Sequence, residues 1–559
     1  MSRCRSIRVL RIHVTFLLML AAAMALSAAS CRSYLPAYTP DSRVGVAAEK
    51  AAAKVEAGAG EKAQTPAPKS PGIAPAAGEK AGGPLEISVQ DAVLMAVENN
   101  RELVVQRETP NIVKTFEDEQ RAVFDPILGA LVSGGRTKYE ENRRNFLGRR
   151  TTEESSSFLS ASMLTLLPTG TTVGVDLSTG AVEESFRERL AQTRAGLTVT
   201  QALLRGFGPE VNLASLRQAR LDTQASEYML RGFAEAVVAQ AEEAYWDYVQ
   251  SLGEAEVASR GAVMAEKQLS DVLERIKAGT LADTERASAQ VEVDLRRQNV
   301  IDARSQIAKT RLHLLRLLNP QGGDLWAREI RCTSPIVKPK EPLDDVELHA
   351  QVAMKMRPDL NQARLAVQRG DLEIIKTRNG LLPRLDLFVT LGRTAYSRSF
   401  SNATLNPNAL GYDVFGGVSM EYPVLNRGPK ALYQRATLTR QQASEAVANL
   451  EQLVQEDVRT AYVEVIRAQE QVVATAATSK SRAEQLTAEN EKYRFGRSSS
   501  FSVARAQNDL VDSQFAEVSA ATEVMRAYVQ LYLLEGSLLD RRGISAPGRD
   551  PSKMPPARP

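Results

Sequence analysis

The sequence predicts an α+β membrane protein made of two internal repeats, each combining β-strands with a long helical hairpin. Three observations support this fold class. Two long stretches lack proline, several short segments alternate between apolar and polar residues, and similar turn motifs recur in both halves of the chain. Together they predict long helices attached to strands that have one apolar face.

The composition suits long helices better than a thick globular core. Of the 559 residues, 43% are hydrophobic, 25% are charged and only 5% are aromatic. Helices rich in alanine and charged residues need few large side chains, which fits these proportions. The formal net charge is +3, so the charges nearly cancel and no basic field indicates nucleic-acid binding.

Cysteine and histidine are too sparse for the usual metal or disulfide sites. Beyond the N-terminal segment only Cys31 and Cys332 occur, so no internal disulfide framework is expected. His13, His313 and His349 are far apart and no Cys/His cluster surrounds them, so we expect no metal and no cofactor. A surface hydrolase is disfavoured for the same reason, because so few histidines leave little material for a catalytic triad.

The N-terminus has the pattern of a secretory signal peptide, covering residues 1–30. An arginine-rich start precedes an apolar run from Val14 to Leu26, which is short for a permanent membrane helix. The stretch 26–31 resembles a bacterial lipobox, which predicts a lipid on Cys31 that would anchor the chain in outer membrane lipid. Ala28 departs from that motif, where a larger aliphatic residue is typical, and ordinary signal cleavage nearby is the alternative.

Shifts in composition predict the remaining segments. Residues 31–84 are rich in Ala, Pro, Gly, Lys and Glu and are expected to form a lipid-anchored flexible linker. Residues 85–335 form the first repeat, with an opening helix from Leu85, strands and a long helical hairpin. Residues 336–545 form the second repeat, with a helix, two strands and another hairpin. Residues 546–559 are expected to be a disordered tail.

The long helices are predicted by the absence of proline. No proline occurs between Pro209 and Pro320 or between Pro429 and Pro547, and proline would break or kink a helix interior. The segments 210–278 and 430–495 would each extend roughly 100 Å at 1.5 Å per residue. Helices of this length must pack side by side, as coiled-coil-like neighbours.

Both long helices end at a matching glycine turn. Gly279 and Gly496 follow the last turn of each helix, where a glycine in the left-handed backbone conformation usually ends an α-helix. Asp283 in the first repeat, and one residue of 498–500 in the second, could cap the returning helix. The same number of residues separates each glycine from an Ala-Gln pair, as an internal duplication predicts.

Period-two alternation predicts the strands. It is clear in Thr171–Thr179, in Arg384–Gly392 apart from Phe388, and in Tyr412–Tyr422. The pattern fits a half-buried sheet or a barrel wall in lipid, although soluble sandwiches share it. After the signal there is no second run of about 18 apolar residues, which leaves a closed β-barrel as the way to span a membrane. The first repeat offers four β-like segments, near 127–136, 157–167, 171–180 and 195–203.

Several short motifs resemble those of the TolC-like outer-membrane factor family. The resemblance covers roughly residues 85–545 and rests on the order and duplication of the motifs. They are Glu98-Asn99-Asn100, Phe124-Asp125-Pro126, the strand-to-helix junctions at 201–206 and 423–428, and the strand entry at 381–386.

This resemblance implies a homotrimer that shares one transmembrane β-barrel and one long α-helical barrel. It implies a passive exit duct of a tripartite efflux or type I secretion system in the cell outer membrane, extending into the periplasm. The implied partners are a periplasmic adaptor and an inner-membrane pump or exporter, which would supply energy, since this chain has no P-loop. The family archetype has two strands per repeat. Four in the first repeat would raise the shared barrel from 12 to 18 strands, unless the extra hairpin lies outside the membrane.

The resemblance also suggests a gate at the periplasmic helix tips. Glu285 and Tyr493 fall on gating positions of the family, while Arg497 is adjacent to the position of its gating arginine. A link from Glu285 to Arg497 or to Tyr493 is therefore a hypothesis. The family's lumen carboxylates fall on Ser502 and Arg505, which puts an acidic ring in doubt. The alternative is that Glu285 and Arg505 are solvated surface charges.

The same tips are the expected adaptor-docking surface, and in a simpler interpretation their glycines only form turns. The candidates are Gly279, Thr280, Leu281, Gly496, Arg497 and Ser498. A periplasmic adaptor or coiled-coil scaffold lipoprotein without a pore is the rival function, although two hairpins are expected here and adaptors usually have one. The exported substrate and the identity of the pump do not follow from the sequence.

Overall fold

The computed structural model describes residues 85–141, 150–184, 190–321, 325–336, 343–397 and 410–544. The chain divides into two units, Met1–Glu79 and Lys80–Pro559, and every described residue belongs to the second. The predicted signal peptide, the Cys31 lipid site, the linker up to residue 84 and the tail from residue 546 lie outside the described residues.

The described chain begins with a short strand and not with a helix. Strand β1 (Leu85–Ile87) pairs in parallel with β6 (Ile330–Cys332), so the helix predicted from Leu85 starts later than expected. Ser88 is the N-cap of α3 (Val89–Asn99), as predicted. Its hydroxyl accepts from the Asp91 amide while the Asp91 carboxylate accepts from the Ser88 amide. This capping box satisfies two backbone donors at the helix start.

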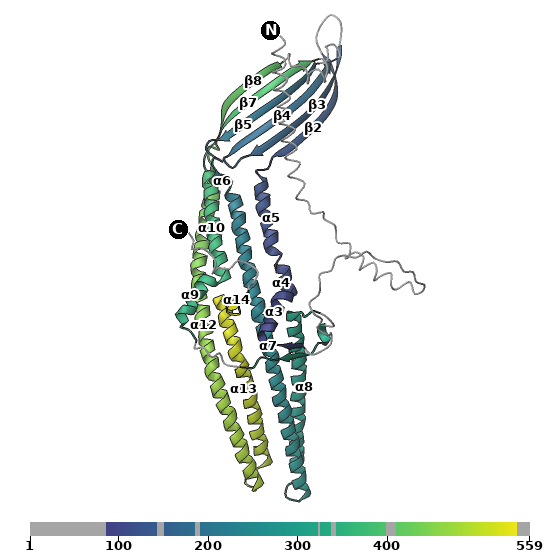
Figure 1. Ribbon diagram of the computed structural model, residues 1–559, viewed down its shortest axis with the longest axis vertical. Helices are drawn as coiled ribbons and strands as arrows, with labels where there is room; N and C mark the ends of the chain where they lie inside the picture. The colour runs from purple at the N-terminus through teal and green to yellow at the C-terminus, as the bar shows by residue number, and fades with distance from the viewer. Residues whose placement is uncertain are drawn as a thin grey trace, which may run out of the picture. The chain divides into compact units, whose positions relative to one another are not determined.

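Six antiparallel strands form one sheet in the order β2-β3-β4-β5-β7-β8 (Figure 1). The four segments predicted in the first repeat are all strands, and the second repeat contributes two, as predicted. Their bounds are β2 Ile127–Glu141, β3 Arg150–Leu166, β4 Thr171–Glu184, β5 Leu190–Ala202, β7 Arg384–Ser397 and β8 Leu410–Glu421. The β3–β4 hairpin pairs with β2 on one side and with β5 on the other, so it lies inside the sheet.

Two helical hairpins follow the strands, one in each repeat. The first consists of α7 (Ala214–Lys277, 64 residues) and α8 (Thr284–Leu318). The second consists of α12 (Arg427–Arg494, 68 residues) and α13 (Ser500–Glu535). Both long helices confirm the prediction made from the proline-free stretches. Pro429 lies in the first turn of α12, where no intrahelical hydrogen bond from its nitrogen is needed.

The other described helices are shorter and include those that join the hairpins to the sheet. They are α3, α4 Arg101–Gln106, α5 Thr109–Ala122, α6 Pro209–Asn212, η2 Leu325–Ala327, α9 Val346–Met356, α10 Pro358–Asn379 and α14 Leu538–Arg541. Four helices lead directly into or out of the sheet: α5 into β2, α7 after β5 and the short α6, α10 into β7, and α12 after β8 (Figure 1). They pack in the order α5–α7–α10–α12.

The core of the second hairpin has coiled-coil spacing. Buried residues on α12 recur at alternating intervals of four and three and pack against α13. They are Val454, Val458, Ala461, Val465 and Ala468. This is the a/d pattern of a coiled coil, with residues small enough for closely approaching helices. The core of the first hairpin is larger, because Tyr245 and Trp246 of α7 also cover the β1–β6 pair through Ile87 and Ile330.

Candidate functional site

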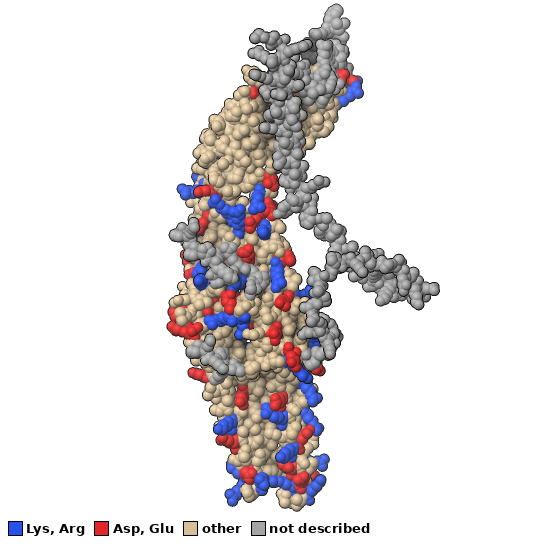
Figure 2. Space-filling view, in the orientation of Figure 1, with Lys and Arg blue, Asp and Glu red and all other residues tan. Residues whose placement is uncertain are grey.

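The register of the sheet gives it one apolar face. Residues that pair directly across antiparallel strands lie on the same side of a sheet. One such row crosses all six strands and is apolar throughout: Leu128, Met163, Val175, Leu197, Leu391 and Val414. Leu128 is 69% exposed and Val414 is 68% exposed. Where the sheet is visible in Figure 2, its surface is almost free of charged side chains, whereas charges of both signs cover the helices.

The next row, on the opposite face, is polar or small in every strand. Its members are Gly129, Ser162, Asp176, Gly196, Gly392 and Asp413. A Cβ atom at Gly196 would collide with the Asp176 carboxylate, and one at Gly392 would collide with that of Asp413. The glycines therefore leave room for the two carboxylates to lie across the sheet. Arg194 on β5 donates to Asp413 on β8 with an Nη2–Oδ2 distance of 2.9 Å.

A sheet with these two faces is suited to a boundary between apolar surroundings and water. An exposed apolar surface that runs across a whole sheet is costly in water and favourable against lipid. The polar row was not predicted from the sequence. Its first and last members, Gly129 and Asp413, are 284 positions apart, and only the pairing of the strands aligns them.

The helix tips have the backbone conformation that was predicted for them. Gly279 has φ +76° and Gly496 has φ +70°, the left-handed region in which a side chain is strained. Ser499 caps α13 by accepting from the Ser502 amide, which confirms the cap expected within 498–500. Asp283 is the N-cap residue of α8 but its side chain makes no capping hydrogen bond, so that expectation was wrong.

The residues predicted for adaptor docking surround the two turns. Gly279, Thr280, Gly496 and Arg497 are exposed. Leu281 and Ser498 are half-buried, and the Ser498 hydroxyl donates to Glu489 of the preceding helix. Two aromatic side chains flank the second turn and are largely exposed, Phe495 at 76% and Phe501 at 73%. Phe501 was not predicted from the sequence.

Two of the predicted gate residues, Glu285 and Tyr493, connect the two hairpins, but their partners differ from the predicted ones. Glu285 on α8 accepts from the Ser500 hydroxyl on α13. The Arg275 guanidinium lies over the ring of Tyr493, 4.1 Å from its centroid. Burial raises the pKa of Tyr493, whose hydroxyl has no hydrogen-bond partner among the described residues. The Glu285–Arg497 and Glu285–Tyr493 hydrogen bonds are not formed within the described part of the chain.

A second polar connection between the two hairpins lies farther from their tips. Arg296 on α8 donates to Glu292 with an Nε–Oε1 distance of 2.8 Å and also to Asn508 on α13. Together with Phe501 and Arg505, Glu292 and Asn508 line a groove of about 400 Å³ between the hairpins. Arg505, predicted as a gate residue, therefore faces the space between the two hairpins of one chain.

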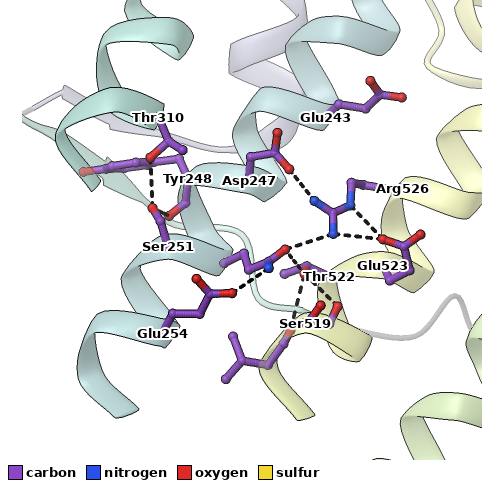
Figure 3. Close-up of polar contacts among 12 residues, drawn as sticks. Glu243, Asp247, Tyr248, Ser251, Glu254, Thr310, Ser519, Thr522, Glu523 and Arg526 are labelled. Atoms are coloured by element: carbon purple, nitrogen blue, oxygen red, sulfur yellow. Dashed lines mark hydrogen bonds and ion pairs between the residues drawn. The ribbon is translucent and has the colours of Figure 1, made fainter. Parts of the chain in front are cut away.

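A third connection ties α7 to α13 midway along the hairpins (Figure 3). Arg526 on α13 donates to Asp247 and, with an Nη2–Oε1 distance of 2.9 Å, to Gln250, both on α7. Thr522 also donates to Gln250 at 3.1 Å. Sequence reasoning missed these residues, since ordinary charged positions on two helices gave no sign that they would meet.

Two buried carboxylates on α7 lie where the C-terminal end of the described chain packs against this helix. Glu242 is fully buried and accepts from Arg542 at 2.6 and 2.7 Å. Burial raises the pKa of Glu242 despite this partner. Glu235 lies 3.5 Å from Arg231, and burial raises its pKa to about 8. Arg231 in turn donates to Asp540 of α14 at 2.8 Å. These contacts stabilise the junction between the first repeat and the C-terminal helix.

Within the ranges that the structure covers, no group of three or more His, Cys, Asp and Glu side chains could hold a metal ion. Among the described helices, none is both long enough and apolar enough to cross a membrane.

The fold is similar to that of solved outer-membrane channels. The Campylobacter jejuni CmeC outer membrane channel matches with a TM-score of 0.61 and 14% identity, over 88% of this chain and 96% of that one. The Neisseria gonorrhoeae MtrE outer membrane channel matches with a TM-score of 0.58 and 16% identity, over 80% and 89%. The Vibrio cholerae outer membrane protein VceC matches with a TM-score of 0.58 and 14% identity, over 80% and 96%.

No curated protein matches the sequence of the chain. The family model described as outer membrane efflux protein matches residues 350–537, which include most of α9, both second-repeat strands and the second hairpin. The second repeat therefore matches the outer membrane efflux protein family, and the described chain shares the fold of solved outer-membrane channels.

Proposed function

We infer that the chain is a trimeric outer-membrane channel that serves as the passive exit duct of a tripartite efflux or type I secretion system. The family and the fold support an exit duct in the outer membrane with a periplasmic extension. The observation that carries the proposal is the pair of adjacent rows in the sheet, apolar from Leu128 to Val414 and polar from Gly129 to Asp413. A wall with these faces can meet lipid on one side and enclose water on the other.

In the proposed trimer, three sheets close into one transmembrane β-barrel and the helices form an α-helical barrel beneath it. A single sheet of six strands has two free edges, and closure removes such edges. The coiled-coil spacing of α12 supports helices that continue to pack against neighbours in the same way. The rival function, an adaptor or scaffold without a pore, does not explain why one face of the sheet is apolar.

The gate is proposed at the helix tips, with Glu285, Tyr493, Arg497 and Arg505 as its residues. Within one chain, Glu285 and Tyr493 already connect the two hairpins through Ser500 and Arg275. Releasing these contacts would let the hairpins move apart and widen the passage. Arg497 is exposed beside the turn and can reach a neighbouring copy.

The exposed turns at Gly279 and Gly496 are proposed to dock a periplasmic adaptor, which connects the duct to an inner-membrane pump or exporter. Glycine and small residues permit close approach of another helix end, and Phe495 provides an exposed apolar contact. Cys31 is proposed to carry a lipid anchor in the outer membrane.

The oligomeric state tests this proposal. Purified full-length protein in detergent should sediment as a trimer and should migrate as one on a gel until it is heated. A chemically cross-linked sample from cells should also contain an adaptor and an inner-membrane protein. A folded monomer that copurifies with neither would contradict the proposed function.

A further inference from the structure

We propose that the β3–β4 hairpin is part of the membrane wall, so that three copies of the chain close an 18-stranded barrel in which β2 of one copy pairs with β8 of the next. The number follows from six strands per copy. This inference rests on the proposed trimeric channel and specifies how its copies join and how wide the pore is.

The hairpin occupies the middle of the sheet and has no helix of its own. Strands β2, β5, β7 and β8 each connect to one of the four helices α5, α7, α10 and α12, whereas β3 and β4 connect only to other strands. Because β3 pairs with β2 along 15 residue pairs and β4 pairs with β5 along 12, the hairpin is held on both sides. It cannot leave the wall without breaking both the β2–β3 and the β4–β5 pairing.

The turn of the hairpin is built into the junction with the helices. Its four residues, 167–170, are closed by a hydrogen bond from the Gly170 amide to the Leu167 carbonyl at 2.9 Å. The side chain of Asn212, on α6, donates to the Pro168 carbonyl at 3.0 Å and to the Gly206 carbonyl at 2.8 Å. One amide side chain thus fastens both the hairpin turn and the segment that leads from β5 to α7.

The two faces of the hairpin continue those of its neighbours. Leu159 and Met163 of β3 and Val175 and Leu177 of β4 lie on the apolar face. On the polar face, β3 and β4 carry serine, glycine and threonine at Ser156, Ser160, Ser162, Thr172, Gly174, Ser178 and Gly180. The large apolar exceptions on this face are Phe158, Leu164 and Leu166 of β3 and Val182 of β4. A hairpin outside the membrane would leave its large apolar side chains in water, at about 25 cal/mol per Å² of exposed apolar surface.

The free edges of the sheet have compatible directions. β2 runs away from the helices, because α5 precedes it, and β8 returns to them, because α12 follows it. When copies are arranged around an axis, the β2 edge of one copy therefore meets the β8 edge of the next in antiparallel orientation. These edges are 15 and 12 residues long, and long unpaired edges are unstable unless another strand covers them.

The sizes of the two barrels also agree. Eighteen strands spaced about 4.8 Å apart and tilted by about 40° give a circumference of about 110 Å. Four sheet-connected helices per copy, at interaxial distances of about 8–10 Å, give about 100–120 Å in a trimer. At the same tilt four strands per copy would give about 75 Å, so a 12-stranded barrel would need a larger tilt to match the helices. With the hairpin included, the two circumferences agree at an ordinary tilt.

Cross-linking tests which strands meet between copies. In a Cys332→Ser background, Leu128→Cys or Val132→Cys on β2 is combined with Val414→Cys or Met420→Cys on β8 and treated with a flexible bismaleimide, because strand tilt staggers the two edges at closure. We expect covalent trimers from at least one of these pairs and only monomers from each single variant. The matched control combines Val175→Cys on β4 with Val414→Cys, and it should give no product between copies. Products between copies from the control pair, without any from the β2–β8 pairs, would overturn the 18-stranded barrel while leaving a trimer.

The accessibility of single cysteines in liposomes gives a second test, which does not depend on cross-linking between copies. Leu159→Cys carrying a bimane label should be quenched by brominated lipid, and Ser160→Cys should react with a charged maleimide. Leu391→Cys and Thr390→Cys on β7 are the controls for the two faces. If the β7 controls behave as expected but Leu159→Cys is not quenched, the hairpin lies outside the membrane. If the β7 controls fail too, the proposed channel itself is wrong.

Discussion

Arg275 on α7 holds Tyr493 on α12 by two contacts, with its guanidinium 4.1 Å from the ring centroid and its Nη1 3.2 Å from the Tyr493 carbonyl oxygen. This is a connection between the first and the second hairpin near their tips. A cation over an aromatic ring contributes about 0.5–2 kcal/mol, with the larger values in desolvated sites. Contacts of this strength can keep two helix ends together and still be released by a docking partner.

Replacing Arg275 with Ala should therefore loosen the tips and raise the single-channel conductance in planar bilayers. The matched control is Arg494→Ala, since Arg494 is the neighbour of Tyr493 but pairs with Glu491 of its own helix. We expect the control to keep the wild-type conductance. Equal conductance in wild type, R275A and R494A would show that this contact does not restrict the passage.

Glu285→Ala should raise the conductance as well, because it removes the acceptor that holds Ser500. If the two residues act as a pair, Ser500→Ala should give a similar increase, and the double variant should add little to either single change. Additive effects in the double variant would indicate that Glu285 acts through a different partner. No change in either single variant would refute the assignment of Glu285 to the gate.

Arg194→Ala should increase the preference of the channel for cations. The change leaves Asp413 and Asp176 on the polar face without the nearby positive charge of Arg194. Reversal potentials in a potassium chloride gradient measure this preference. Arg393→Ala is the control, because the register puts Arg393 beside Ala195, on the apolar face. A larger shift in the control than in R194A would mean that the two faces have been assigned the wrong way round.

Arg542→Ala should destabilise the fold strongly, since it leaves the fully buried Glu242 carboxylate without its partner. Removing one member of a buried ion pair costs about 3–5 kcal/mol. Arg316→Ala breaks an ion pair with Glu102 whose side chains are both 54% exposed, and should cost at most about 1 kcal/mol. Melting temperatures followed by circular dichroism compare the two variants. Equal shifts would contradict a stabilising role for the Glu242–Arg542 pair.

The stability of the wild-type protein should fall as the pH rises from about 4.5 to about 8, in part through Glu235. Burial raises the pKa of this carboxyl from 4.5 to about 8, so over that interval the folded state holds a proton that the unfolded state has lost. The contribution is fully present at lower pH and is lost as the pH rises through the folded-state pKa. Glu235→Gln cannot titrate, and its melting temperature should change less over the interval. An unchanged slope in E235Q would show that other groups cause the dependence.

The main elements of the fold could be predicted because they depend on local patterns. Proline-free stretches mark α7 and α12, and period-two alternation marks β4, β7 and β8. The β1–β6 pair could not be predicted in this way. Each strand has three residues, and the partners Ile87 and Cys332 are far apart in the chain, so local periodicity is too short to reveal them.

The site was only partly predictable for a related reason. Backbone requirements are local, and the turn glycines Gly279 and Gly496 were therefore found from the sequence. Side-chain partners between hairpins depend on how far one helix slides past another. That offset decides that Glu285 meets Ser500 and that Asp247 meets Arg526, and no motif in either helix encodes it.

Three copies of this chain are proposed to enclose a continuous aqueous passage. Single-channel recording of the purified, full-length protein in planar lipid bilayers can detect that passage. We expect discrete ionic currents from trimeric fractions, larger in the Glu285→Ala variant than in the wild type. A folded, trimeric preparation that inserts into the bilayer and passes no ions, either as wild type or as E285A, would contradict this proposal.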